Sequence, residues 1–185
     1  MRQRAIADRS CLFRYCTGLG TVLMVLQFAA AHGQIGGRKS PEPGPTQPKA
    51  DARVLRALAD AKLKYSVNKF GDCELLFSLD DDRTQVVFVN SETEHWGEME
   101  IRSVWAFGYL SKTRLSQAKL ERLLKQNGKL KSGAWHLSDG ETIGAVFSVK
   151  VAADCDGNAL RTVATGVAEQ ADEMEKLLTS GSDEY

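Results

Sequence analysis

Two histidines, His95 and His136, are the side chains in the central part of this 185-residue sequence best suited to acid–base chemistry. Histidine changes its charge near neutral pH, so a histidine beside carboxylates is typical of hydrolases. His95 lies among acids in SETEHWGE, and His136 follows Trp135. A hydrolase also needs a nucleophile and an orienting group, and the sequence has no G-x-S-x-G, H-E-x-x-H or Cys/His signature. We therefore predict no catalytic residue, and keep a small hydrolase-like enzyme using His95 or His136 with carboxylates as the alternative.

Two acidic segments match cation sites only in part. Residues 154–158, Asp-Cys-Asp-Gly-Asn, open like an EF-hand loop, but Ala159 stands where glycine is needed and Thr165 where glutamate is needed. Residues 80–82, Asp-Asp-Asp, are typical of a hairpin turn. The cysteines lack the spacing of a zinc site. We predict neither a metal ion nor a cofactor.

The four cysteines divide into Cys11 and Cys16 near the N-terminus and Cys73 and Cys155 in the folded part. An even pair in an oxidising compartment favours a disulfide. Cys73 begins the first predicted strand and Cys155 follows the last, so the two lie within reach of a bond if those strands are antiparallel neighbours. We predict this disulfide; the alternative is two buried, reduced cysteines.

Periodicity predicts the elements that position these residues. Helical spacing of apolar residues covers 51–63, the stretch from the N-cap Ser116 to Asn127, and a last helix capped by Asn158. Alternating or continuous apolar runs predict strands at 73–79, 84–90, 99–107, 134–137 and 142–152. The order α-β-β-β-α-β-β-α predicts an α+β domain, with a mostly antiparallel five-stranded sheet packed against three helices.

The first two strands are apolar on both faces, which raises the question of what covers the second face. Leu75, Phe77 and Leu79 alternate with Leu76, and the next strand contains four consecutive apolar residues. Either the helices divide between both faces, or a partner or second subunit covers one of them.

Aromatic residues are favoured in recognition surfaces. We expect Trp105 and Phe107 in the core and Trp96, which lies among charged residues, on the surface. The predicted partner-binding residues are Leu76, Val86, Phe88 and Trp96.

The N-terminal third differs in composition from the rest. Four arginines precede the apolar run 19–31, and Ala29 and Ala31 place small residues where a signal peptidase cleaves. We predict a signal peptide at 1–31, with an uncleaved membrane anchor as the alternative. All four prolines fall in 41–48, so 32–50 is a predicted disordered linker, 51–179 the folded domain and 180–185 a flexible tail.

Removal of residues 1–31 leaves 20 basic and 23 acidic residues. A mildly acidic chain argues against nucleic acid, which is bound by clustered Lys and Arg. We expect the protein in the periplasm or outside the cell, with no contact to the membrane except through an uncleaved signal segment.

Three segments resemble those of the YbjN-type family, which is similar in fold to type III secretion chaperones. They are LLKQNGKLKSGAWHL, the terminal EQADEMEKLL, and FGDCELLFSLDDDRTQVVFV, and the resemblance covers residues 51–179. It implies a regulatory or chaperone-like binder without an established catalytic role, and a fold that dimerises and holds extended peptides. We therefore expect an exported, non-enzymatic protein that recognises a polypeptide, with a homodimer as one possibility. The alternatives are a periplasmic hydrolase-like enzyme and an envelope structural or stress protein without a discrete ligand.

Overall fold

The computed structural model describes residues 49–138 and 142–179, all within one compact unit, Gln47–Tyr185. In these residues α1 (Ala52–Asp60), α2 (Gln117–Asn127) and α3 (Gly157–Thr179) are the three helices, besides a 3₁₀ turn at Asp80–Asp82. The strands are β1 (Ser66–Val67), β2 (Cys73–Ser78), β3 (Thr84–Val89), β4 (Glu94–Trp96), β5 (Met99–Ser111), β6 (Ala134–Ser138) and β7 (Ile143–Ala152). The predicted α+β class with three helices is confirmed, and the short strands β1 and β4 are additional to the five predicted strands.

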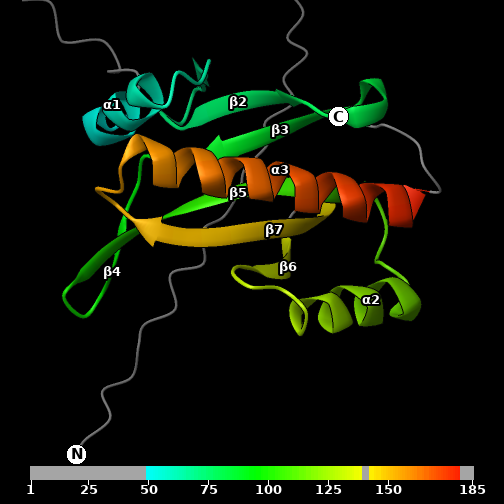
Figure 1. Cartoon of the computed structure of the whole chain (residues 1–185). Coiled ribbons are helices and arrows are strands. Elements are labelled where there is room, and N and C mark those ends of the chain that lie inside the picture. The colour runs from blue at the N-terminus through cyan, green and yellow to red at the C-terminus, as the bar shows by residue number, and fades with distance from the viewer. Residues whose placement is uncertain (1–48, 139–141, 180–185) are drawn as a thin grey trace, which may run out of the picture. The chain divides into compact units, whose positions relative to one another are not determined.

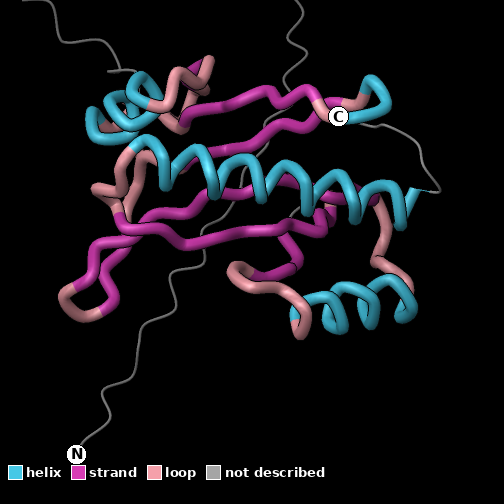
Figure 2. Tube along the Cα trace, viewed as in Figure 1, coloured by secondary structure: helices cyan, strands magenta, loops and turns pink. Residues whose placement is uncertain are grey.

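All strand pairs are antiparallel, and the sheet order is β1-β2-β3-β5-β7-β6, with β4 paired to β5 (Figures 1 and 2). The expectation that the first and last long strands are neighbours is wrong, because β3 and β5 lie between β2 and β7. Strand β7 pairs over most of its length with β5, from Ile101 to Ser111, although α2 and β6 lie between the two strands in the chain.

Helix α3 crosses one face of the sheet over β3, β5 and β7, and α1 packs beside its N-terminal end (Figure 1). Helix α2 lies along the β6 edge. The described helices therefore do not divide between the two faces of β2, β3 and β5. We call the face toward α3 the closed face and the opposite one the open face.

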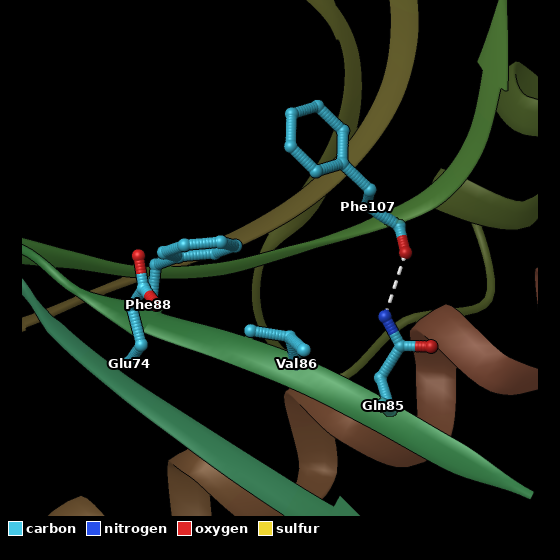
Figure 3. Close-up of a pocket in the computed structure, with 5 residues that line it drawn as sticks. All are labelled: Glu74, Gln85, Val86, Phe88 and Phe107. Atoms are coloured by element: carbon cyan, nitrogen blue, oxygen red, sulfur yellow. Dashed lines mark hydrogen bonds between the residues drawn. The ribbon is translucent and has the colours of Figure 1, made fainter. Parts of the chain in front are cut away.

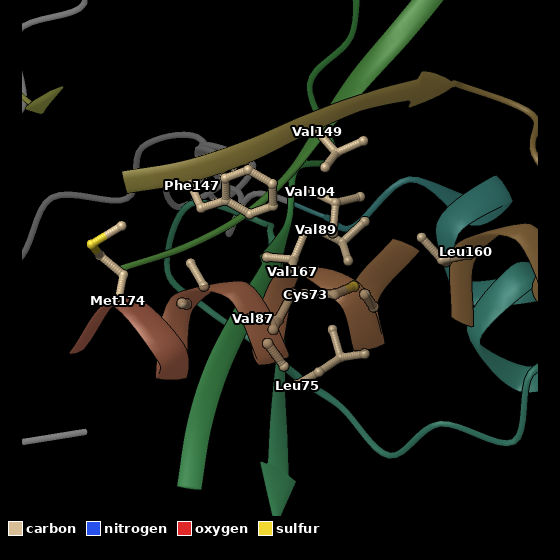
Figure 4. Packing of buried hydrophobic residues seen from close by; sticks show 14 of the residues in the cluster. Cys73, Leu75, Val87, Val89, Val104, Phe147, Val149, Leu160, Val167 and Met174 are labelled. Atoms are coloured by element: carbon tan, nitrogen blue, oxygen red, sulfur yellow. The ribbon is translucent and has the colours of Figure 1, made fainter. Parts of the chain in front are cut away.

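The closed face holds the core. The predicted stripe of α3 is confirmed, since Leu160, Val167, Ala171 and Met174 are buried. They pack on alternate strand residues (Figure 4), among them the buried side chains of Cys73, Leu75, Val87, Val89, Val104, Phe147 and Val149. Such interdigitation of a helix stripe with one pleat of a sheet removes both apolar surfaces from water.

Strand β5 alternates as predicted, but its faces are the reverse of the expectation. Arg102 is 2% exposed on the closed face beside Val104 and Ala106, whereas Trp105 and Phe107, expected in the core, lie on the open face. A buried cation is tolerated when its donors are satisfied. The Arg102 guanidinium donates to Asp51 Oδ2 at 2.8 Å. It also donates to the main-chain oxygens of Ala153 and Asn90, each at 2.9 Å.

A second buried charge cluster joins β3 to α3. Arg83 donates from Nε to Asp172 Oδ1 at 2.5 Å and from Nη2 to Glu175 Oε2 at 2.6 Å, and all three residues are buried. Lys176 reaches Asp172 Oδ2 at 2.9 Å. The apolar spacing that predicts α3 gives no indication that these two acids are buried.

The helix ends agree with the sequence in part. Ser116 caps α2 as predicted, since its Oγ accepts from Lys119 N, and α2 ends at Asn127. Helix α3 is capped two residues earlier than predicted, because Asp156 Oδ1, and not the side chain of Asn158, accepts from Ala159 N at 2.8 Å.

Candidate functional site

The open face of the sheet is the candidate functional site, and strand register defines its residues. Leu76 pairs with Val86, Glu74 with Phe88, and Phe88 with Trp105. Side chains of directly paired residues point to the same side of a sheet. Continuing through β5, β7 and β6 adds Phe107, Val146, Ser148, Lys150 and His136 to this face.

Three aromatic rings form a cluster at the centre of the open face. Phe88 stacks on Trp105 with ring centroids 4.3 Å apart and an interplanar angle of 17°, and Trp105 meets Phe107 edge-on at 5.2 Å and 88°. The Trp105 indole is held in place, because its Nε1 donates to Asn90 Oδ1 at 2.7 Å. All three rings are half-buried. The cluster is therefore an ordered apolar platform that still presents surface to solvent.

Next to the cluster, strands β3 and β5 separate and leave a pocket. They pair only at Phe88–Trp105 and Val89–Val104, although β3 remains paired to β2 as far as Thr84. A register shift between Phe107 and Tyr109 bends β5 at the same place. The resulting pocket of about 280 Å³ is lined by Glu74, Gln85, Val86, Phe88 and Phe107 (Figure 3).

Gln85 bridges the two strands where they separate. Its Nε2 donates to the main-chain oxygen of Phe107 at 2.8 Å, across the gap seen in Figure 3. The side chain is 1% exposed, and its Oε1 has no hydrogen-bond partner among the described residues. Gln85 thus substitutes for a ladder hydrogen bond and fixes the width of the pocket.

Three of the four predicted partner-binding residues lie together on this face. Leu76, Val86 and Phe88 occupy neighbouring positions of β2 and β3, and Leu76 is 68% exposed. Trp96 is 73% exposed, as expected of a surface residue, and pairs with the exposed Met99 in the β4–β5 hairpin. Six residues of β5 separate Met99 from Trp105, about 20 Å of strand, so Trp96 lies outside the aromatic cluster.

The charges of the open face are few. Lys150 and Glu94 form an ion pair at 2.5 Å. Glu74 lies across from Phe88 at the pocket and forms no ion pair with any residue in the described ranges. Partial desolvation by surrounding protein atoms lowers the pKa of His136 below its usual 6.5, and the positive charge of Lys150 lowers it further. Beside the aromatic cluster, Glu74 is thus an acidic residue without an ion-pair partner among the described residues.

The two candidate histidines do not meet. His95 pairs with Glu100 near one end of β5, whereas His136 pairs with Val146, which is opposite Phe107. Glu100 and Phe107 are seven positions apart on β5, which corresponds to about 23 Å of strand. The positions also alternate, so the two imidazoles belong to opposite faces. The pocket contains neither of them, and no site of the kind a hydrolase would need joins them in the part of the chain described.

The predicted disulfide is not formed, because Cys73 and Cys155 are both free thiols. Its geometric basis was the adjacency of the first and last strands, and the sheet order removes that adjacency. Burial raises the pKa of the Cys73 thiol to about 11 and also raises that of Cys155. Both thiols are therefore protonated at neutral pH and poor nucleophiles.

The acidic segments have structural contacts. Asp80, Asp81 and Asp82 form an exposed turn between β2 and β3, and Asp156 caps α3. Within residues 49–138 and 142–179, no group of three or more His, Cys, Asp or Glu side chains is arranged to hold a metal ion.

The predicted signal peptide, including Ala29 and Ala31, lies outside the described residues, as do most of the linker and the tail 180–185. In the described part, no helix is long and apolar enough to cross a membrane.

Comparison with known proteins finds no match. No family model matches the chain, and neither a curated protein nor a solved structure matches it significantly. The resemblance to the YbjN-type family therefore stays a prediction from the quoted segments.

Sequence reasoning missed four residues of the site: Trp105 and Phe107, which were expected in the core, and Glu74 and Gln85, which line the pocket. A usable signal was present in β5, where the residues that alternate with the aromatics are the small Val104, Ala106 and Gly108. Small residues are the ones that a closely packed helix requires.

Proposed function

We propose that this protein is a non-enzymatic binding protein that holds an extended polypeptide segment of a partner on the open face of its sheet. The observation that carries the proposal is the ordered cluster of Phe88, Trp105 and Phe107 beside a pocket, on a face that no described helix covers. Aromatic side chains bury much area at little entropic cost, which is why they are enriched in recognition surfaces.

An extended peptide fits the geometry of this face. Alternate side chains of an extended chain are about 6.6 Å apart, the same spacing as the rows of outward residues on β2 and β3. Val86 and Phe88, both half-buried, form such a row along β3, and the exposed Leu76 lies beside Val86 on β2. Apolar side chains of a partner would pack between them, and the pocket would take one side chain.

The charges favour a polypeptide over a nucleic acid. The open face presents Glu74 and Glu94 against a single Lys150, and nucleic-acid binding needs clustered basic residues. The predicted signal peptide places this binding in the periplasm or outside the cell, and the resemblance to chaperone-like proteins supports a chaperone-like or regulatory role for it.

Site-specific photocrosslinking of the full chain in the cells that make it tests this proposal. Benzoylphenylalanine replaces Leu76 on the open face or, as a matched control, Leu124 on α2, which is 70% exposed against 68% for Leu76. We expect a polypeptide adduct from position 76 that disappears when Phe88→Ser is added, and none from position 124.

Mass spectrometry of the adduct identifies its second component. A different polypeptide supports the proposal, whereas an adduct of two copies of this chain replaces it with a homodimer through the open face. Equal labelling from positions 76 and 124, or no adduct from position 76, overturns it.

A further inference from the structure

The pocket on the open face is lined mostly by apolar side chains but contains one acidic side chain, Glu74. Glu74 lines it together with Val86, Phe88 and Phe107, and Glu74 pairs across the strands with Phe88. Because Glu74 forms no ion pair in the described residues, its carboxylate is available to a cation from outside.

Three basic residues on or next to the neighbouring strands β3, β5 and β7 are already paired. Lys150 is held by Glu94, so it is not free to neutralise Glu74. Arg102 and Arg83 are buried on the closed face with their own acceptors. The nearby Asp72 carboxyl accepts from the Ser91 main-chain nitrogen; burial is the main cause that raises the pKa of Asp72, and the charges of Glu92 and Glu74 raise it further. The surroundings of Glu74 are thus electronegative, which favours a positively charged ligand group.

The size and lining of the pocket restrict what that group can be. A volume of about 280 Å³ lies just below the roughly 300–1,000 Å³ of small-molecule sites, so one side chain suits it better than a larger ligand. Val86, Phe88 and Phe107 would contact an aliphatic stem. The charged end of that ligand side chain would then lie next to the Glu74 carboxylate and an aromatic ring.

Arginine meets these conditions better than lysine. Its planar guanidinium is weakly hydrated, binds a carboxylate through two parallel hydrogen bonds and stacks on aromatic rings, whereas the lysine ammonium is a strongly hydrated point charge. We propose that the pocket selects an arginine side chain of the bound segment, which pairs with Glu74 and packs its stem against Val86, Phe88 and Phe107. This proposal rests on the proposed function, because it assigns one position of the peptide held on the open face.

Fluorescence polarisation with defined peptides tests the selection. The probe is a labelled 13-residue peptide of alternating leucine and serine with one central arginine, and the matched peptides carry citrulline, lysine or glutamate there. Citrulline keeps the shape of arginine without its charge. We expect the full chain to bind the arginine peptide about tenfold more tightly than the citrulline peptide, with lysine between them.

Variants assign the preference to Glu74. Glu74→Gln should bind the arginine and citrulline peptides equally, whereas Glu121→Gln, an exposed acid on α2, should keep the wild-type preference. Circular dichroism and thermal melting show that both variants are folded. A Glu74→Gln chain that still prefers arginine overturns the proposal, as does a wild-type chain that binds no arginine peptide.

Failure of the selection is distinguishable from failure of the proposed function. If Phe88→Ser weakens binding of the citrulline peptide while Glu74→Gln does not change the preference between the peptides, the open face binds peptides and the arginine selection is wrong. If the Phe88→Ser variant binds the citrulline and arginine peptides as tightly as the wild-type chain does, the peptides are bound elsewhere. The proposed function and the arginine selection then both fail.

Discussion

The two faces of the sheet use the same strands but different kinds of side chain. The closed face carries fully buried apolar residues, most of them aliphatic, and the buried cations Arg83 and Arg102, each with its acceptors in place. The open face carries the large rings of Phe88, Trp105 and Phe107, which are only half-buried.

This difference shows that polarity alone does not decide which face is inside. Helix α3 approaches the sheet through the small residues Ala164, Ala168 and Ala171, and Gly108 of β5 lies where this approach is close. A Cβ atom on Gly108 would lie 3.1 Å from the main-chain oxygen of Ala171 and closer still to the Trp135 ring. Under the helix there is room for the buried rings of Phe147 and Trp135 but not for a side chain at Gly108, and charges are accommodated where hydrogen bonds satisfy them. Stability and binding should therefore depend on separate sets of residues.

The largest effect should come from the charge cluster of the closed face. Replacing Arg83 by Met leaves the buried Asp172 and Glu175 without their shared cation, and an uncompensated buried charge costs about 3–5 kcal/mol. We expect the Arg83→Met variant to lose about that much free energy of unfolding in urea denaturation. The control Lys125→Met removes an exposed pair and should cost less than about 1 kcal/mol. Similar small losses in both variants would contradict the separation of the faces.

Neighbouring leucines of β2 give a sharper comparison, since Leu75 is 1% exposed and Leu76 is 68% exposed. Leu75→Ala creates a cavity under α3 and should lower the free energy of unfolding by about 2–5 kcal/mol. Leu76→Ala should change it by less than about 0.5 kcal/mol, while weakening binding of the leucine–serine peptides. Urea denaturation and fluorescence polarisation of both variants measure the two effects. If Leu76→Ala were as destabilising as Leu75→Ala, the open face would be part of the core.

Acid should act mainly through the closed face. The hydrogen bonds from Arg53 and Thr93 lower the pKa of Glu100 to about 2, and those from Arg53 and Arg102 hold the pKa of Asp51 well below its usual range. A carboxylate with a lowered pKa stabilises the fold above its unfolded pKa, about 4–4.5, and this contribution is lost as the pH falls toward the folded value.

We therefore expect the urea concentration at the unfolding midpoint to decrease as the pH is lowered from about 4.5 to about 2. Arg53→Met should flatten this decline, because the pKa of Glu100 then returns toward normal, and Lys125→Met should leave it unchanged. A midpoint independent of pH over this range would show that the network of Asp51, Arg53 and Glu100 does not contribute to stability.

The sequence predicted the helices, the long strands and the core stripe of α3, because each follows from local periodicity. The alternation of Leu75 and Leu76 and the exposure of Trp96 were also predicted correctly. The orientation of β5 was not, since both of its faces mix polar and apolar residues and only the packing distance of α3 decides between them. The pocket depends on where β3 and β5 stop pairing, which is a nonlocal property. The disulfide failed for the same reason, because strand order cannot be obtained from strand sequences alone.

The smallest predicted effect concerns His136, the titratable imidazole of the open face. Crowding by neighbouring atoms and the positive charge of Lys150 both lower its pKa below 6.5, while a hydrogen bond involving the Ala134 main chain opposes them. We expect NMR titration of the His136 ring protons to give a midpoint below 6.5, and Lys150→Met to raise that midpoint by a fraction of a pH unit. Lys125→Met, on α2, should leave it unchanged. A midpoint at or above 6.5 would mean that neither the surrounding protein atoms nor Lys150 lower the pKa of the ring. A lowered midpoint instead leaves His136 uncharged at neutral pH, so Glu74 carries the unpaired charge beside the aromatic cluster, as the arginine selection requires.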